Sequence, residues 1–281
     1  MIKLDLRKIV RSQNEVSRFD WLKYAEKKLS SAGITTARLD CLVILEDTLN
    51  KNRTHILAYQ ESYISPVVLN ILNRKIRRRS THEPLAYIRG KCEFYGREFL
   101  INKHVLVPRP ESETMIDLLK SLKIKQPFVL ADVGSGSGCL GITAKLEFPN
   151  ITVDMLELND NAYKVCKKNK QHLGVDNSVI ESDLLESTTS QYDVILANLP
   201  YVPDGYQINQ AAAMEPPIAI FGGLDGLDLY RKLFRQLSSQ KHLKYVFTES
   251  FPFQHQALID IADSSGYRLL KSDAFIQVFT V

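Results

Sequence analysis

The segment Asn198-Leu-Pro-Tyr201 places an amide, a proline and an aromatic ring one residue after a strand-like run, 192–196. A planar nitrogen with two hydrogens, such as an amide or an exocyclic base amine, is a poor nucleophile. The Asn198 side-chain oxygen and the Leu199 carbonyl can accept both hydrogens, which holds the nitrogen and stabilises the positive charge that develops when it attacks an electrophile. Tyr201 can pack on the flat target. We therefore predict a catalytic and substrate-binding site at Asn198, Leu199, Pro200 and Tyr201.

A glycine-rich turn, Asp132-Val-Gly-Ser-Gly-Ser-Gly138, stands between a predicted strand and a predicted helix. Alternating glycines allow a tight turn and let a ligand approach without a Cβ in the way. Glu157 ends the next predicted strand, 19 residues beyond Gly138, where a carboxylate can accept both hydroxyls of a ribose. These residues predict a nucleoside cofactor, with a binding set of Gly134, Ser135, Gly136, Ser137, Gly138 and Glu157.

The identity of the cofactor depends on where the turn lies. The run 136–141 matches G-x-G-x-x-G, which would suggest NAD. However, the predicted strand ends near Val133, so the turn is 134–138 and Gly141 falls one turn into the helix. This favours S-adenosylmethionine, whose methionine part is zwitterionic and needs no pyrophosphate cradle. NAD and a purely structural glycine turn remain the alternatives.

The first part of the chain has the pattern of a small helical domain. Apolar residues follow helical spacing over 19–29, 37–49 and 67–76, the last after an N-cap serine and a first-turn proline, Ser65-Pro66. Short aromatic and β-branched pieces around Gly90 and Gly96 then predict a β-hairpin over 88–107. We expect a helical domain at 1–85 and a hairpin linker at 86–109.

Strands and helices alternate in the rest of the chain, 110–281. Such alternation predicts an α/β fold with a mainly parallel sheet covered on both faces, and the two closing strands suggest an antiparallel edge hairpin. The predicted strands are 128–133, 152–157, 179–182, 192–197, 244–248, 267–270 and 275–281. The predicted helices are 140–148, 162–173, 227–237 and 254–264.

Composition narrows the class of partner. The 281 residues carry a net charge of +4, which is too small to argue for nucleic acid. The four cysteines lie far apart without clustered histidines, so neither a metal site nor a disulfide framework is indicated. Charges run through the first 30 residues and no apolar stretch has the length of a membrane span, so we expect a cytoplasmic protein. The basic run 73–79 is expected to be a solvated helix face, with a contact to RNA or an acidic protein as the alternative.

Taken together, the motifs resemble one protein family. Asn198-Leu-Pro-Tyr201 is similar to the Asn-Pro-Pro-Tyr box of amino-methyltransferases, which DNA adenine methyltransferases share. The chain as a whole resembles the HemK/PrmC family, the protein glutamine methyltransferases that act on peptide chain release factors. The resemblance extends over nearly the whole length and is carried by the segments 37–40, 84–90, 105–113, 132–138 and 215–226.

The resemblance implies a Rossmann-like methyltransferase fold, S-adenosylmethionine as cofactor, and a release factor as protein partner. It implies that the box grips the glutamine amide of a Gly-Gly-Gln motif while the 1–85 domain helps hold the release factor. It also implies that Asn198 lines the cofactor pocket and that Asp183 and Leu184 lie near the adenine edge. The chain departs from the family pattern at Leu199, where proline is usual, at Glu157, where aspartate is common, and in its final strand, which lacks a usual arginine.

Three other functions compete with this interpretation. A close relative could methylate a glutamine in a ribosomal protein. Methylation of adenine in nucleic acid would favour a dedicated recognition domain and a basic cleft, which the composition does not support, so no stable nucleic-acid binding is expected. A noncatalytic adaptor would be expected to have lost Asn198 or the glycines, and both are present.

Overall fold

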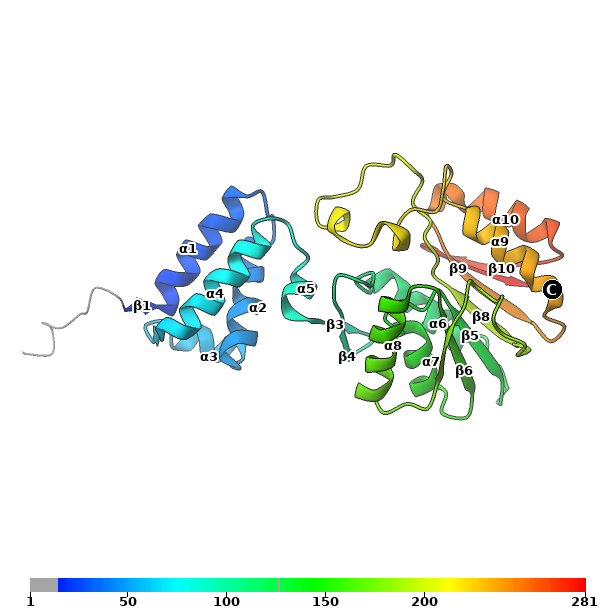
Figure 1. Cartoon of the computed structure of the whole chain (residues 1–281), viewed down its shortest axis with the longest axis horizontal. Coiled ribbons are helices and arrows are strands. Elements are labelled where there is room, and N and C mark those ends of the chain that lie inside the picture. Colours follow the sequence, from blue (N-terminus) through cyan, green and yellow to red (C-terminus); the bar gives the residue numbers. More distant parts are fainter. Residues whose placement is uncertain (1–14, 126) are drawn as a thin grey trace, which may run out of the picture. The chain divides into compact units, whose positions relative to one another are not determined.

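The computed structural model describes residues 15–125 and 127–281. The chain forms two compact units, one that ends at Arg89 and one that spans Gly90–Val281 (Figure 1). Residues 1–14, which begin the predicted 1–85 domain and its charged N-terminal stretch, lie outside the described residues. Along the described part of the chain, no helix combines the length and the apolar character that a membrane span requires.

The first unit is helical, as predicted. Ser17 caps the first helix by accepting a hydrogen bond from the Asp20 amide, and Ser65 caps α4 in the same way ahead of Pro66. Its core includes the fully buried Trp21 and Leu45. The helices are α1 (Arg18–Ser31), α2 (Ala37–Leu49), α3 (Arg53–Ala58), α4 (Pro66–Arg79) and α5 (Leu85–Arg89). A two-stranded antiparallel pair, β1 (Val16–Ser17) and β2 (Tyr63–Ile64), was not predicted.

The basic run 73–79 forms the last turns of α4. Arg74 and Arg77 are exposed, as expected of a solvated helix face. Arg79 corrects that expectation: its side chain is buried, and its Nε donates to Asp40 Oδ2 at 2.7 Å. Arg78 pairs with Glu83 across the end of the helix. Part of this basic run therefore stabilises the helical unit itself.

The second unit contains a seven-stranded sheet. Its order is β10-β11-β9-β8-β5-β6-β7, with β5 to β9 parallel and the last two strands antiparallel. This confirms the predicted mainly parallel sheet with an antiparallel C-terminal edge. The strands are β5 (Val129–Val133), β6 (Thr152–Glu157), β7 (Ser178–Glu181), β8 (Val194–Ala197), β9 (Tyr245–Glu249), β10 (Arg268–Asp273) and β11 (Ile276–Thr280).

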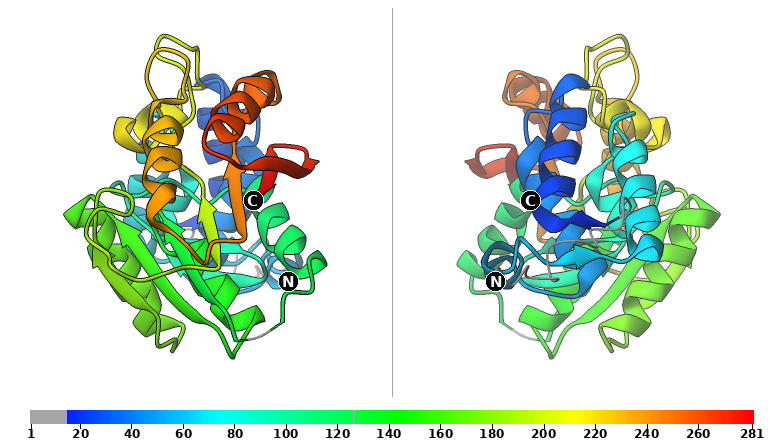
Figure 2. Two further views of the ribbon diagram at one scale, coloured as in Figure 1. Left: turned by 90° about the vertical axis from the view of Figure 1, so that its right-hand side faces the viewer. Right: turned by 90° about the vertical axis from the view of Figure 1, so that its left-hand side faces the viewer.

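Helices cover both faces of this sheet (Figure 1, Figure 2). Side chains from α6, α7 and α8 share one core with the sheet, and side chains from α9 and α10 share the other. The helices are α6 (Glu113–Ser121), α7 (Cys139–Glu147), α8 (Asp160–His172), α9 (Asp228–Gln236) and α10 (His255–Ser264). Short 3-10 turns occupy Pro110–Ser112, Ala212–Met214, Pro217–Ala219, Leu237–Ser239 and Pro252–Gln254.

The predicted hairpin consists of β3 (Lys91–Phe94) and β4 (Arg97–Leu100) and belongs to the second unit. Its two turn residues, Tyr95 and Gly96, both have positive φ, which matches the twist of a tight hairpin. Phe94 and Phe99 are buried in the core beneath α6. The functional division of the chain into 1–85, 86–109 and 110–281 stays a prediction.

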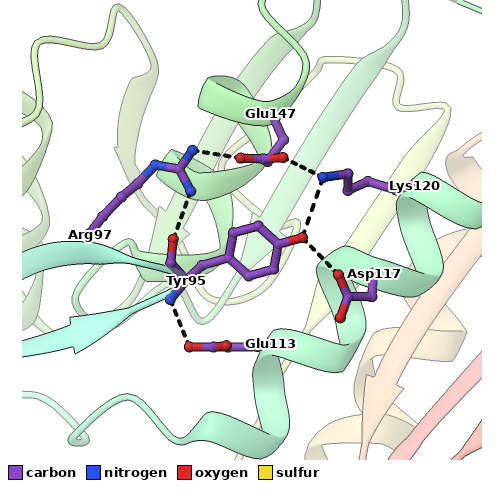
Figure 3. A network of polar contacts seen from close by, with 6 residues as sticks. All are labelled: Tyr95, Arg97, Glu113, Asp117, Lys120 and Glu147. Carbon is purple, nitrogen blue, oxygen red and sulfur yellow. Dashed lines mark hydrogen bonds and ion pairs between the residues drawn. The ribbon is translucent and has the colours of Figure 1, made fainter.

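A polar network fixes the hairpin tip to two helices of the second unit (Figure 3). The Tyr95 amide donates to Glu113 Oε1 at 2.7 Å and the Tyr95 hydroxyl donates to Asp117 at 2.7 Å, both on α6. Arg97 and Lys120 both pair with Glu147 on α7. Because α6 starts beside the site described below, this network also helps set the position of that helix.

Candidate active site

A cavity lies at the carboxyl ends of β5, β6 and β8, where the chain order reverses on either side of β5. In open α/β sheets this is the usual place for a ligand. The predicted residues that line it are Gly134, Ser135, Gly136, Ser137, Glu157, Asp183, Leu184, Asn198, Leu199 and Pro200. Gly138 and Tyr201 do not line the cavity, although both were predicted for the site.

The three glycines of the loop, Gly134, Gly136 and Gly138, all have positive φ. The surroundings of each one favour glycine for a different physical reason. A Cβ on Gly136 would meet no atom within 4 Å, so this residue leaves open space at the cavity. A Cβ on Gly134 would lie 2.9 Å from the Leu199 side chain, so the two predicted motifs touch there. A Cβ on Gly138 would lie 2.8 Å from the sulfur of Cys166, so Gly138 faces the core and begins α7.

Glu157 is tied to the glycine loop. Its Oε2 accepts from the Gly136 amide and its Oε1 from the Asn159 amide, both at 2.8 Å. Burial raises the pKa of this carboxyl, and the main-chain donors oppose that rise. Each carboxylate oxygen keeps a further lone pair, so the side chain can hold the loop and still accept a ligand hydroxyl.

Two more carboxylates line the cavity. Asp132 lies beneath the loop, where its Oδ2 accepts from the Gly141 amide at 2.8 Å, and burial raises its pKa to about 7. Asp183 pairs with Lys232 on α9 at 2.6 Å. Next to it, Leu184 has φ of 55°, a backbone conformation that a non-glycine residue rarely adopts. The cavity therefore offers carboxylates at its floor and rim.

Asn198 is held at its nitrogen end. Its Nδ2 lies 2.9 Å from both Ser112 Oγ and Glu249 Oε2. In the part of the chain that the structure describes, no donor is hydrogen-bonded to Asn198 Oδ1 or to the Leu199 carbonyl. Two neighbouring oxygens are thus left to accept hydrogens from a ligand, as the proposed grip on a planar nitrogen requires.

Tyr201 is held by contacts with Glu249 and Phe251. Its hydroxyl donates to Glu249 Oε1 at 3.1 Å, and its ring packs edge-on against Phe251 with 5.1 Å between centroids. Burial and the Glu249 charge raise the pKa of its hydroxyl. In this arrangement Tyr201 supports Glu249.

Further hydrogen bonds join the chain segments that surround the site. Glu215 is buried, and it accepts from Arg109 Nη2 at 2.6 Å and from the Val107 amide at 2.9 Å, which joins the segments 105–113 and 215–226. Gln254 Nε2 donates to the carbonyls of Tyr201 and Asp225. The loop after the box is therefore tied to both sides of the site.

Ser112, Glu249 and Tyr230 were not among the predicted site residues. Tyr230 is fully buried, and its hydroxyl bonds to the backbone at the ends of both β8 and β9. Glu249 ends β9, the strand beside β8, so a search for polar residues at the carboxyl ends of predicted strands could have found it. The sequence carries no such signal for Ser112 or Tyr230.

Two domain families match the chain, the PrmC N-terminal domain over residues 20–90 and the methyltransferase small domain over residues 112–215. A release factor glutamine methyltransferase from Koribacter versatilis is 34% identical over 227 residues, which cover 78% of this chain and 80% of the relative. A release factor glutamine methyltransferase from Coxiella burnetii is 30% identical over 254 residues, which cover 88% of this chain and 92% of the relative.

The chain is also 33% identical over 234 residues to a bifunctional methyltransferase from Rickettsia typhi, and it spans about half the length of that relative, 45%. Two solved structures share its fold at low sequence identity. A methyltransferase from Pyrococcus furiosus has a TM-score of 0.50 at 17% identity, covering 74% of this chain and 96% of that one. The hMettl16 catalytic domain has a TM-score of 0.52 at 13% identity, and the match covers 76% of this chain and 81% of that one.

Proposed function

Because the chain belongs to the release factor glutamine methyltransferase family, we propose that it methylates the side-chain amide nitrogen of a glutamine in a peptide chain release factor, in the cytoplasm. The methyl donor in this proposal is S-adenosylmethionine, and the target is the glutamine of the Gly-Gly-Gln motif. The observation that carries the proposal is the pair of oxygens, Asn198 Oδ1 and the Leu199 carbonyl, beside a cavity that the glycine loop borders.

The residues present fit the methyl donor. The open space at Gly136 leaves room for the ligand next to the loop, and Glu157 has lone pairs for a ribose. Asp132 and Asp183 place carboxyl groups along the cavity, and the sulfonium and ammonium groups of a bound ligand would favour the ionised form of both. When bound, S-adenosylmethionine supplies an electrophilic methyl group whose transfer leaves a neutral thioether.

The chain's own residues hold the acceptor nitrogen. Asn198 Oδ1 accepts one amide hydrogen and the Leu199 carbonyl accepts the other, so the nitrogen is fixed in place. Pro200 favours extended backbone at Leu199. As positive charge develops on the nitrogen, both hydrogen bonds strengthen. Once the N–C bond has formed and the S–C bond of the donor has broken, the positively charged nitrogen would be acidic enough to lose its proton to solvent, so no strong general base is needed.

The helical first unit is proposed to hold the release factor. The support is its match to the PrmC N-terminal domain and its position in the sequence ahead of a complete cofactor cavity. This assignment is separate from the chemistry, which needs only residues of the second unit.

The direct test is to incubate the purified protein with a release factor and S-adenosylmethionine and to map methylation by peptide mass spectrometry. A single methyl group on the Gly-Gly-Gln glutamine is expected, and a release factor with that glutamine changed to alanine is the control. Ribosomal proteins and adenine-containing DNA and RNA are tested in parallel. If one of these substrates is methylated and the release factor is not, the proposal is rejected.

A further inference from the structure

The donor and acceptor ends of the Asn198 amide are not interchangeable in this structure. Glu249 is 1% exposed at the end of β9, and its Oε2 accepts from Ser112 Oγ at 2.6 Å. Asn198 Nδ2 lies 2.9 Å from each of these two oxygens. A carboxylate only accepts hydrogen bonds, and the single hydroxyl hydrogen of Ser112 is already donated to Glu249. Both oxygens can therefore only accept from Asn198.

Turning the Asn198 side chain over would place its oxygen 2.9 Å from Glu249 Oε2, which already accepts from Ser112 Oγ, with no hydrogen between the two oxygens. A buried contact of that kind is unfavourable, because two acceptors repel and neither is satisfied by water. The nitrogen end of Asn198 is thus fixed toward Glu249, and its oxygen is left for the target.

The Glu249 carboxylate also holds the side chain of Tyr201, the last residue of the box. Its Oε1 accepts from the Tyr201 hydroxyl at 3.1 Å. Its main chain is fixed by Tyr230, whose hydroxyl donates to the Glu249 carbonyl at 2.6 Å and accepts from the Glu249 amide at 3.2 Å. Glu249 is therefore rigidly placed, which a positioning residue must be.

We propose that Glu249 is a positioning residue that sets the polarity of Asn198, so that the site selects a carboxamide NH₂ and rejects a carboxylate. This inference rests on the proposed function, since it names what makes that site specific for glutamine. A glutamate at the target position would bring its carboxylate toward two acceptor oxygens. A glutamine brings two hydrogens.

The test compares wild type with Glu249→Met, which keeps the chain length and removes the acceptor. Turnover at saturating release factor is expected to fall by about 10²–10³, while S-adenosylmethionine affinity changes by less than about threefold. Inhibition by a release factor carrying glutamate at the target position is measured as well. Because a freed Asn198 can turn its NH₂ toward a carboxylate, the preference for glutamine over glutamate should narrow by about tenfold.

Asp154→Leu is the matched control. Asp154 is also a buried carboxylate that accepts from a tyrosine hydroxyl, Tyr192, at 3.0 Å, but it does not line the cavity. Its loss should lower the melting temperature and leave the glutamine preference of the folded protein unchanged. A structural role for Glu249 would give the same result in Glu249→Met, and that outcome would overturn the inference.

A second pair of variants keeps the test independent of how well Glu249→Met folds. Asn198→Asp puts two carboxyl groups side by side, and turnover should nearly vanish at a pH high enough to remove the proton that they would otherwise share. Adding Glu249→Gln exchanges the amide and the carboxylate, so the amide introduced at position 249 donates to the carboxylate introduced at position 198. Turnover should then recover by about tenfold or more over the single variant.

No recovery in a folded double variant would overturn the inference. A wild-type protein that does not methylate the release factor would instead reject the proposed function, and the inference with it.

Discussion

A hydrogen bond accelerates a reaction only when it is stronger in the transition state than in the ground state. In the proposed mechanism the acceptors at Asn198 and Leu199 meet this condition, because the target nitrogen would gain positive charge and its hydrogens would become better donors. The Leu199 acceptor is a main-chain carbonyl, which substitution does not remove. The Asn198 acceptor is a side chain, so its contribution can be measured directly.

Asn198→Ala is expected to lower turnover by about 10²–10³, or roughly 3–4 kcal/mol in barrier height. S-adenosylmethionine affinity should fall much less, because the glycine loop and Glu157 are held by contacts that do not involve Asn198. Turnover and cofactor affinity are measured on the same folded preparation. Near-normal turnover would reject the grip on the amide, and equal losses in both quantities would make Asn198 chiefly a cofactor ligand.

The single residue Asp132 leads to a prediction of how stability depends on pH. Burial raises its pKa from 3.8 to about 7, so between these pH values the folded protein keeps a proton that the unfolded chain releases. Its contribution to the free energy of unfolding is fully present below about pH 4 and is lost as pH rises to about 7, up to about 4 kcal/mol. Asp132→Asn keeps an acceptor for the Gly141 amide and cannot ionise.

The expected result is a shallower fall in the free energy of unfolding with rising pH for Asp132→Asn than for wild type. Denaturant unfolding of both proteins across this pH range provides the measurement, and the difference between the two curves isolates the residue. Parallel curves would show that Asp132 ionises normally.

Among the elements, the glycine loop is the one whose shape the cavity needs most. Gly136→Val adds a branched side chain at a φ of 55° and directs it into open space at the cavity. We expect cofactor binding to be abolished with the fold largely intact, at a backbone cost of about 1–2 kcal/mol. Calorimetry with S-adenosylmethionine measures the loss.

Gly174→Val is the control for strain. Gly174 has φ of 68°, a Cβ there would also meet no atom within 4 Å, and it does not line the cavity. The two variants should lose similar stability, and only Gly136→Val should lose the cofactor. If Gly136→Val binds with unchanged affinity, the loop does not belong to the cofactor site.

The strands of the second unit and four of its helices could be predicted from their periodicity, but α6, which packs in the same core, was not among the predicted helices. The six-residue α3 and the five-residue α5 are too short for a helical period to show. The paired strands β1 and β2 have two residues each, so their alternation is equally invisible.

The glycine loop and the box could be recognised in the sequence because each is a local motif, and the structure brings residues of both to one cavity. Glu249 lies 51 residues from Asn198, and only the pairing of β8 with β9 brings the two together. Tyr201 was expected to pack on the flat target, and its hydrogen bond to Glu249 could not be predicted from the sequence. Contacts that depend on strand order are therefore the part of the site that the sequence did not reveal.

At the scale of the whole molecule, the chemistry and the proposed recognition of the partner are divided between the two units. Every residue that lines the cavity lies between His104 and Leu229, within the second unit. The first unit has its own buried core, built from α1, α2 and α4. A unit with a separate core that adds nothing to the cavity can contribute binding energy without taking part in the reaction.

A chain that begins at Gly90 should therefore bind S-adenosylmethionine within about threefold of the full chain and methylate a release factor with a KM raised by about tenfold or more. Turnover at saturation should change much less, because binding energy lost equally from ground state and transition state appears in KM alone. A short Gly-Gly-Gln peptide serves as control, since both chains should methylate it equally. Slower methylation of that peptide by the shortened chain would mean that the first unit supports the active site itself. An unchanged KM for the release factor would mean that the first unit does not hold the substrate.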